Sequence, residues 1–62
     1  MNNSRYIVQK LIEFDIENKL EVWRNTSIRS DNIGSLMNFI SDDYRIYDLK
    51  MNVVVKRSKK RT

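Results

Sequence analysis

The sequence predicts a small α+β domain, in which an antiparallel sheet with the order strand, strand, helix, strand carries one helix packed on one face. Apolar and polar residues alternate over residues 5–16 and again over residues 44–57, which is the period of a strand. Between these segments, apolar residues recur with helical spacing from Ile33 to Ile40. The stretch FDIENKLEVW, residues 14–23, has turn-forming residues between two apolar segments and predicts a hairpin.

The first two strands are expected to join through a three-residue loop. Asp15 suits the start of a type I turn, and Asn18 suits the left-handed position that follows it. Asp15 then faces Lys19, which is a favourable charge pair. A two-residue loop at residues 18–19 is the alternative, and it would turn the side chains over. The preferred register predicts a core face formed by seven residues: Tyr6, Val8, Ile12, Phe14, Leu20, Val22 and Ile28.

The same register places the one tryptophan of the chain on the opposite face. Trp23 is predicted to lie opposite Leu11, with Ile7 nearby, and no other segment is expected to cover this face. Tryptophan is enriched in binding hot spots because it buries much area with few rotatable bonds. We therefore interpret this patch as a protein-contact surface covered by a second chain. The alternative is that the C-terminal segment folds over Trp23.

The helix is expected to begin at Ser30 or Asp31, which are good N-cap residues, and to end near Ser41. Gly34 within it costs roughly 1 kcal/mol relative to alanine. This cost argues against a long helix.

Residues 44–57 are expected to form one long bent strand or two short ones, with Asp48 at the bulge or break. Their apolar positions Leu49, Met51 and Val53 are predicted to lie on an exposed edge. A second copy of the chain could pair with this edge, because an unpaired strand presents free backbone groups.

Composition limits how such a domain can be stabilised. The chain has 62 residues, no cysteine and no histidine. A domain of about 60 residues buries only about 60% of its unfolded surface, and here neither a disulfide nor a zinc site can compensate. These properties favour a homodimer.

The charge is unevenly distributed. The chain carries a net charge of +4, but the last seven residues contain five basic side chains: Lys56, Arg57, Lys59, Lys60 and Arg61. The other 55 residues hold seven basic and eight acidic side chains, a balance of −1. We therefore predict a single domain over residues 1–56 and a basic tail over residues 57–62. The tail could neutralise nucleic-acid phosphates or could simply keep a small protein soluble.

The sequence contains no recognisable catalytic set, and neither a cofactor nor a metal is expected. Without histidine, the commonest general base is absent, and Gly34 alone cannot form a phosphate-binding loop. Asp42 and Asp43 could hold Mg²⁺ together with Asp48, but a solvated helix end is the favoured interpretation. We therefore predict a chain that is not an enzyme.

The predicted function is that of a non-enzymatic protein-interaction module. The chain lacks alanine and proline, and in type it resembles the small accessory or inhibitor proteins of phages and mobile elements. Such proteins bind a larger host protein or complex, for example a defence enzyme, in the host cytoplasm. No membrane span is expected, because no apolar segment is long enough. The alternative functions are nucleic-acid binding, through the basic tail and aromatic residues of the sheet, and a structural role within a larger assembly.

Overall fold

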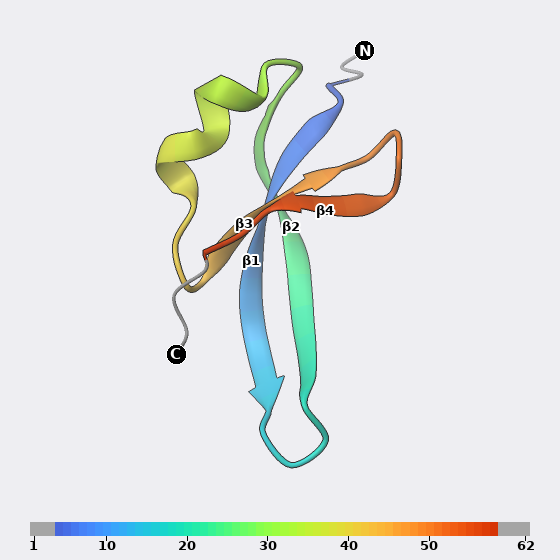
Figure 1. Ribbon diagram of the computed structural model, residues 1–62, viewed down its shortest axis with the longest axis vertical. Coiled ribbons are helices and arrows are strands. Elements are labelled where there is room, and N and C mark those ends of the chain that lie inside the picture. Colours follow the sequence, from blue (N-terminus) through green and yellow to red (C-terminus); the bar gives the residue numbers. More distant parts are fainter. Residues whose placement is uncertain (1–3, 59–62) are drawn as a thin grey trace.

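The computed structural model describes residues 4–58, which form a four-stranded antiparallel sheet and a short helix (Figure 1). The elements in chain order are β1 (Tyr6–Asp15), β2 (Leu20–Ser30), the 3-10 helix η1 (Ile33–Phe39), β3 (Tyr44–Asp48) and β4 (Val53–Lys56). The strand order across the sheet is β2-β1-β3-β4. Strands therefore dominate the described residues and the helical part is small, which is compatible with the predicted α+β class. The dimeric state expected from the sequence stays a prediction.

The last segment forms two short strands, which was one of the two alternatives left open by the sequence. Asp48 ends β3, and its Oδ1 accepts hydrogen bonds from the backbone N–H groups of Lys50 and Met51 at 2.9 and 3.1 Å. Asn52 completes the turn with a φ of 59°, a left-handed conformation that asparagine tolerates well. The chain order is therefore strand, strand, helix, strand, strand, with one strand more than predicted.

The helix is shorter than predicted and begins at a different cap. Asn32, rather than Ser30 or Asp31, is the N-cap, and its Oδ1 accepts a hydrogen bond from the Gly34 N–H at 2.9 Å. Asp31 instead accepts a hydrogen bond from the backbone N–H of Arg5 at 2.8 Å. A seven-residue segment with glycine at its second position has little intrinsic helix stability. This low helix stability explains why a short 3-10 helix forms in place of the longer helix expected.

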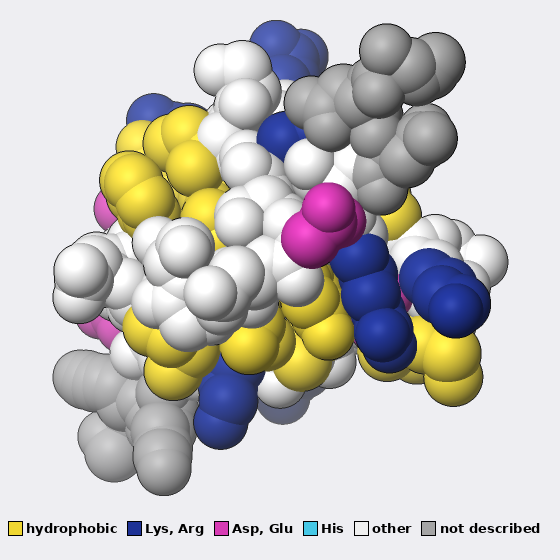
Figure 2. Space-filling model, turned by 90° about the horizontal axis from the view of Figure 1, so that it is seen from above, with side chains coloured by type: hydrophobic (Ala, Val, Ile, Leu, Met, Phe, Trp, Pro, Cys, Tyr) yellow, Lys and Arg dark blue, Asp and Glu magenta, His cyan; other side chains and the backbone are white. Residues whose placement is uncertain are grey.

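The core lies where η1 meets the middle of the sheet. Val8 and Ile46 are directly paired on β1 and β3, and both pack with Leu36 of η1 in one buried cluster. Partly buried neighbours complete this cluster: Tyr6, Ile28, Ile33, Ile40 and Tyr44. Burying a side chain of this size contributes about 1.5–3 kcal/mol. Figure 2 views the molecule from above and shows that further hydrophobic side chains reach the surface.

The beginning of β1 is buried on both faces of the sheet. Ile7 and Val8 are successive strand residues, so their side chains point to opposite faces, yet both are 0% exposed. The expectation that the second face lacks cover within the chain is therefore wrong at this position. Figure 1 shows β3 and β4 crossing β1 and β2 at a steep angle. Such a strong twist lets a small sheet enclose residues on both of its faces.

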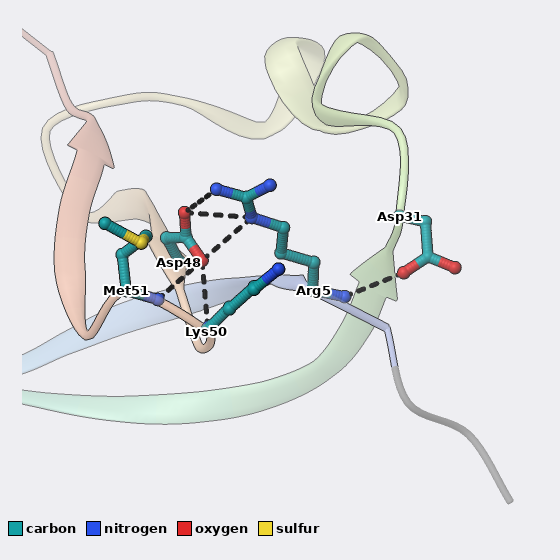
Figure 3. A network of polar contacts seen from close by, with 5 residues as sticks. All are labelled: Arg5, Asp31, Asp48, Lys50 and Met51. Carbon is teal, nitrogen blue, oxygen red and sulfur yellow. Dashed lines mark hydrogen bonds and ion pairs between the residues drawn. The ribbon is translucent and has the colours of Figure 1, made fainter.

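An ion pair links the start of the chain to the β3–β4 turn (Figure 3). The Arg5 guanidinium donates hydrogen bonds to Asp48 from Nε and Nη2 at distances of 2.9–3.1 Å. The Asp48 side chain is only 5% exposed. The hydrogen bond from Arg5 lowers the pKa of the Asp48 carboxyl group most, the backbone N–H groups of the turn lower it further, and burial partly opposes them. The Asp48 carboxylate thus connects the β3–β4 turn to the residue that precedes β1.

Candidate protein-contact surface

The distal half of the β1–β2 hairpin projects beyond the rest of the sheet (Figure 1). β3 pairs with β1 only from Tyr6 to Lys10, and the Leu11 N–H makes one further bond to the Asp43 carbonyl at 2.8 Å. Beyond this point, β1 and β2 pair only with each other among the strands that the structure describes. We call residues 12–22 the hairpin arm.

The hairpin arm exposes large apolar side chains. Phe14 is 50% exposed and Ile16, at the tip, is 75% exposed. Four apolar residues of the arm were predicted to build the core: Ile12, Phe14, Leu20 and Val22. This prediction is wrong because neither β3 nor η1 extends far enough to cover them. A two-stranded hairpin alone is marginally stable in water. The strand pairing places Phe14, opposite Glu21, on one face of the arm, and Leu20 and Val22 on the other. The exposed apolar residues of the arm are Ile12, Phe14, Ile16, Leu20 and Val22.

Irregularities in the strand pairing separate the arm from the base of the hairpin. Leu11 pairs with Trp23, as predicted, but a bulge between Leu11 and Glu13 shifts the register. Phe14 consequently pairs with Glu21 instead of the predicted leucine. Because a shift of one residue moves side chains to the other face, the face predicted from simple alternation does not continue along the whole hairpin.

The loop at the tip has four residues, 16–19, because Asp15 pairs with Leu20. The left-handed residue is Lys19, with a φ of 56°, so the prediction of this role for Asn18 is wrong. Asn18 instead donates hydrogen bonds to the Asp15 carboxylate from its backbone N and its Nδ2 at 3.3 and 2.8 Å. These bonds lower the pKa of Asp15, with the side-chain bond contributing most. The longer loop moves the left-handed position by one residue.

Trp23 lies at the base of the arm and is half-buried by side chains of its own chain. The guanidinium groups of Arg45 and Arg57 lie 4.1 and 5.6 Å from the centroid of its ring. The ring Nε1 donates to Glu21 Oε1 at 3.0 Å, and Arg57 Nη2 pairs with Glu21 Oε2 at 3.1 Å. The hydrogen bond from Arg57, followed by that from Trp23, lowers the pKa of Glu21. Within the described residues, Arg57 thus provides part of the cover that the sequence left open.

The other residues predicted for protein contact are divided between the core and the surface. Ile7 belongs to the core and not to the patch around Trp23, whereas Leu11 is half-buried beside that tryptophan. Leu49 is half-buried in the β3–β4 turn, and Met51 in the same turn is exposed. Val53 opens β4 and is also exposed. The turn therefore interrupts the continuous edge that was predicted for this segment.

The basic residues near the C-terminus do not form one group in the described part of the chain. Lys56 ends β4 and is exposed, whereas Arg57 pairs with Glu21 and lies against Trp23. The remaining predicted nucleic-acid contacts, Lys59, Lys60 and Arg61, lie outside the described residues. Arg57 was assigned to the tail by the sequence, but its side chain packs on β2.

The charge of the hairpin arm differs in sign from that of the rest of the chain. The arm holds four acidic side chains and one basic side chain, Lys19, which give it a net charge of −3. Because the whole chain carries +4, the residues outside the arm carry +7. The arm is therefore both apolar and acidic. Its acidic residues are Glu13, Asp15, Glu17 and Glu21.

The described residues contain no group of three or more side chains suited to hold a metal ion. A shallow recess at the base of the arm is lined by Trp23, Ser41, Asp42, Arg57 and Ser58. No helix within residues 4–58 is long and apolar enough to cross a membrane.

Comparison with protein-family models, with curated proteins and with solved structures gave no match. Trp23 was predicted to be a contact residue, whereas four of the five exposed apolar residues of the arm were predicted to lie in the core. The exposure of the arm had no signal in the sequence, because it depends on the lengths of η1 and β3, which are shorter than predicted.

Proposed function

We propose that the chain is a non-enzymatic protein-interaction module that binds another protein through the hairpin arm. The supporting observation is the set of five exposed, large apolar side chains on a two-stranded projection. Removing apolar surface from water is the main driving force of protein association. The arm would gain this stabilisation on binding, since the described residues leave it uncovered.

The net charge of −3 on the arm favours a partner with a basic surface. An apolar surface surrounded by basic side chains would complement the arm, because opposite potentials speed encounter and disfavour wrong partners. A host protein that handles nucleic acid, such as a defence enzyme, would present a basic surface of this kind. The proposed target class is the one expected from the composition, and its binding surface is expected to be apolar with a basic border.

Capture experiments with two phenylalanine variants test this function. Phe14 lies on the arm and is 50% exposed, whereas Phe39 lies on η1 and is 42% exposed. Phe14→Lys and Phe39→Lys therefore make the same chemical change at similar exposure in different places. We expect tagged wild-type protein and Phe39→Lys to retain the same host protein, and Phe14→Lys to lose it.

Circular dichroism of both variants verifies that each is folded before capture. If folded Phe14→Lys retains the same host protein as wild type, the arm is not the contact element. Equal loss in both variants would indicate a general effect of added charge and would also contradict the proposal.

A second candidate function is nucleic-acid binding, which is favoured by the net charge of +7 outside the arm. Phosphate contacts of basic side chains give an affinity that falls steeply with salt. Stacking of a base on Trp23 would require Arg45 to move from the ring. We expect any such binding to be lost between about 50 and 200 mM salt and on deletion of residues 59–62. Binding that survives both changes would exclude this mechanism.

A further inference from the structure

We propose that a second copy of this chain is one partner of the hairpin arm, and that each arm of a two-fold dimer lies on the β3–β4 turn of the other subunit. This inference depends on the proposed function, since it takes the arm as the contact element. We call the surface it would occupy the turn patch, which consists of Lys50, Met51, Val53 and Lys56.

The turn patch combines apolar and basic side chains at an outer edge of the sheet. Met51 is 60% exposed, Val53 is also exposed, and both lysines of the patch are exposed. β4 is the last strand in the order β2-β1-β3-β4, so one of its edges has no strand partner among the described residues. Figure 2 shows hydrophobic side chains next to Lys and Arg side chains on the side of the molecule where this turn lies in Figure 1.

The charges of the arm and the turn patch are complementary. The arm carries −3 and the two lysines of the patch carry +2. Both surfaces also expose apolar side chains, so their contact would remove apolar area from water while bringing opposite charges together. Each surface thus has the properties that the other requires.

The alternative ways of covering the arm with a second copy are less favourable. Packing one arm on another would bring together two surfaces of −3, and like charges disfavour association. The exposed apolar residues of η1, Met37 and Phe39, lie in a segment bounded by acidic residues: Asp31, Asp42 and Asp43. Among the described surfaces, the turn patch is the apolar surface with a basic border.

The shape of the subunit suits a reciprocal arrangement. The molecule measures 39 × 20 × 19 Å, and the arm extends from the end opposite the β3–β4 turn (Figure 1). A two-fold axis would repeat the contact of arm and patch, so that both arms are covered and the assembly is closed. A single head-to-tail contact would leave one arm free and would extend into an open chain.

Sedimentation equilibrium of the full chain measures this association. We expect a dimer at micromolar concentration whose dissociation constant rises with salt, because part of the attraction is electrostatic. Phe14→Lys is expected to raise the dissociation constant at least about 30-fold, the loss typical of a hot-spot residue. Phe39→Lys and Met37→Lys are matched controls on η1 and should dimerise like wild type.

Exchanging charges between the two surfaces provides the most specific test. The double variant Glu13→Lys/Glu17→Lys changes the arm from −3 to +1, and Lys50→Glu/Lys56→Glu changes the patch from +2 to −2. We expect each variant alone to be monomeric where wild type is dimeric. An equal mixture of the two should form a heterodimer, because each arm then meets a patch of opposite charge.

The outcomes distinguish the dimer from the proposed function. A mixture that remains monomeric, or a charge-exchanged arm that still dimerises, would overturn the reciprocal contact. A monomeric wild type whose arm is still required to capture a host protein would overturn the dimer while leaving the proposed function intact. A third outcome is a dimer that is sensitive to the charge exchange, together with capture of a host protein that does not depend on the arm. This result would support the dimer and overturn a host partner at the arm.

Discussion

The two halves of the β1–β2 hairpin have a similar sequence pattern but very different surroundings. In the base of the hairpin, Val8 is buried under Leu36 of η1 and beside Ile46 of β3. In the arm, Phe14 and Leu20 continue the apolar pattern but are exposed. The comparison shows that alternation identifies apolar strand positions, whereas burial depends on whether another element reaches them. In the base this element is the short helix, and in the arm we propose that it is another protein.

Removing the cover of the base should have the largest effect on stability. Leu36→Ala is expected to lower the free energy of unfolding by about 2–5 kcal/mol, which is most of the stability of so small a domain. Phe14→Ala, which removes a larger side chain from the arm, should cost less than about 1 kcal/mol. Urea unfolding of both variants at a protein concentration where the chain is monomeric measures the difference, and similar losses would show that the arm is buried in the isolated protein.

Acid unfolding distinguishes the same two regions through their carboxylates. The pKa of Asp48 is lowered on folding. The Asp48 carboxylate therefore contributes its full stabilisation above the ordinary pKa of aspartate, near 4. This stabilisation is lost as the pH falls through the lower pKa of the folded state. Asp48→Asn should therefore lower the thermal midpoint at pH 7 and flatten its dependence on pH below about 4. The pKa of Asp15 is also lowered, but this residue lies at the tip of the arm. Asp15→Asn should change the midpoint less, and a reversed order would contradict the assignment of stability to the base.

The extent of successful prediction follows the range of the interactions involved. The strand segments follow from local patterns, and the break at Asp48 was one of two alternatives left open by the sequence. The pairing of Leu11 with Trp23 was also predicted, but from a three-residue loop that the structure does not contain. The exposure of the arm depends on the short reach of η1 and β3, which no local pattern specifies. The pairing of Phe14 with Glu21 depends on a bulge, which inserts a residue without a clear sequence signal.

The candidate site was predictable only in part for the same reason. Trp23 was identified because the predicted register placed it on the face opposite the core. Its contact with Arg57 joins residues 34 positions apart and could not be inferred from spacing. The assignment of Ile7 to an open face failed because the twist of the whole sheet determines which positions are enclosed.

The contacts at the junction of base and arm should have an intermediate effect. Arg57→Ala removes the ion pair with Glu21 and one cation near the Trp23 ring, and a cation–π contact at an exposed site is worth about 0.5–1 kcal/mol. We expect a loss of stability of this size and a red shift of tryptophan fluorescence, because the ring gains contact with water. Arg57→Lys should restore little, since lysine lacks the planar group. Unchanged fluorescence in Arg57→Ala would show that the C-terminal segment does not cover Trp23 in solution.

At the tip of the arm, substitutions are expected to be stabilising or neutral, and the loop can be tested one residue at a time. Lys19 has a positive φ, which costs a residue with a side chain about 1–2 kcal/mol, so Lys19→Gly should be stabilising by up to about 1 kcal/mol. Asn18→Gly should give no gain, because it removes the side-chain hydrogen bond to Asp15 and leaves the left-handed residue unchanged. The urea midpoints of the two variants decide between the loops. If Asn18→Gly is the stabilising variant, the three-residue loop is correct, the register of the arm shifts, and Phe14 faces Leu20 after all.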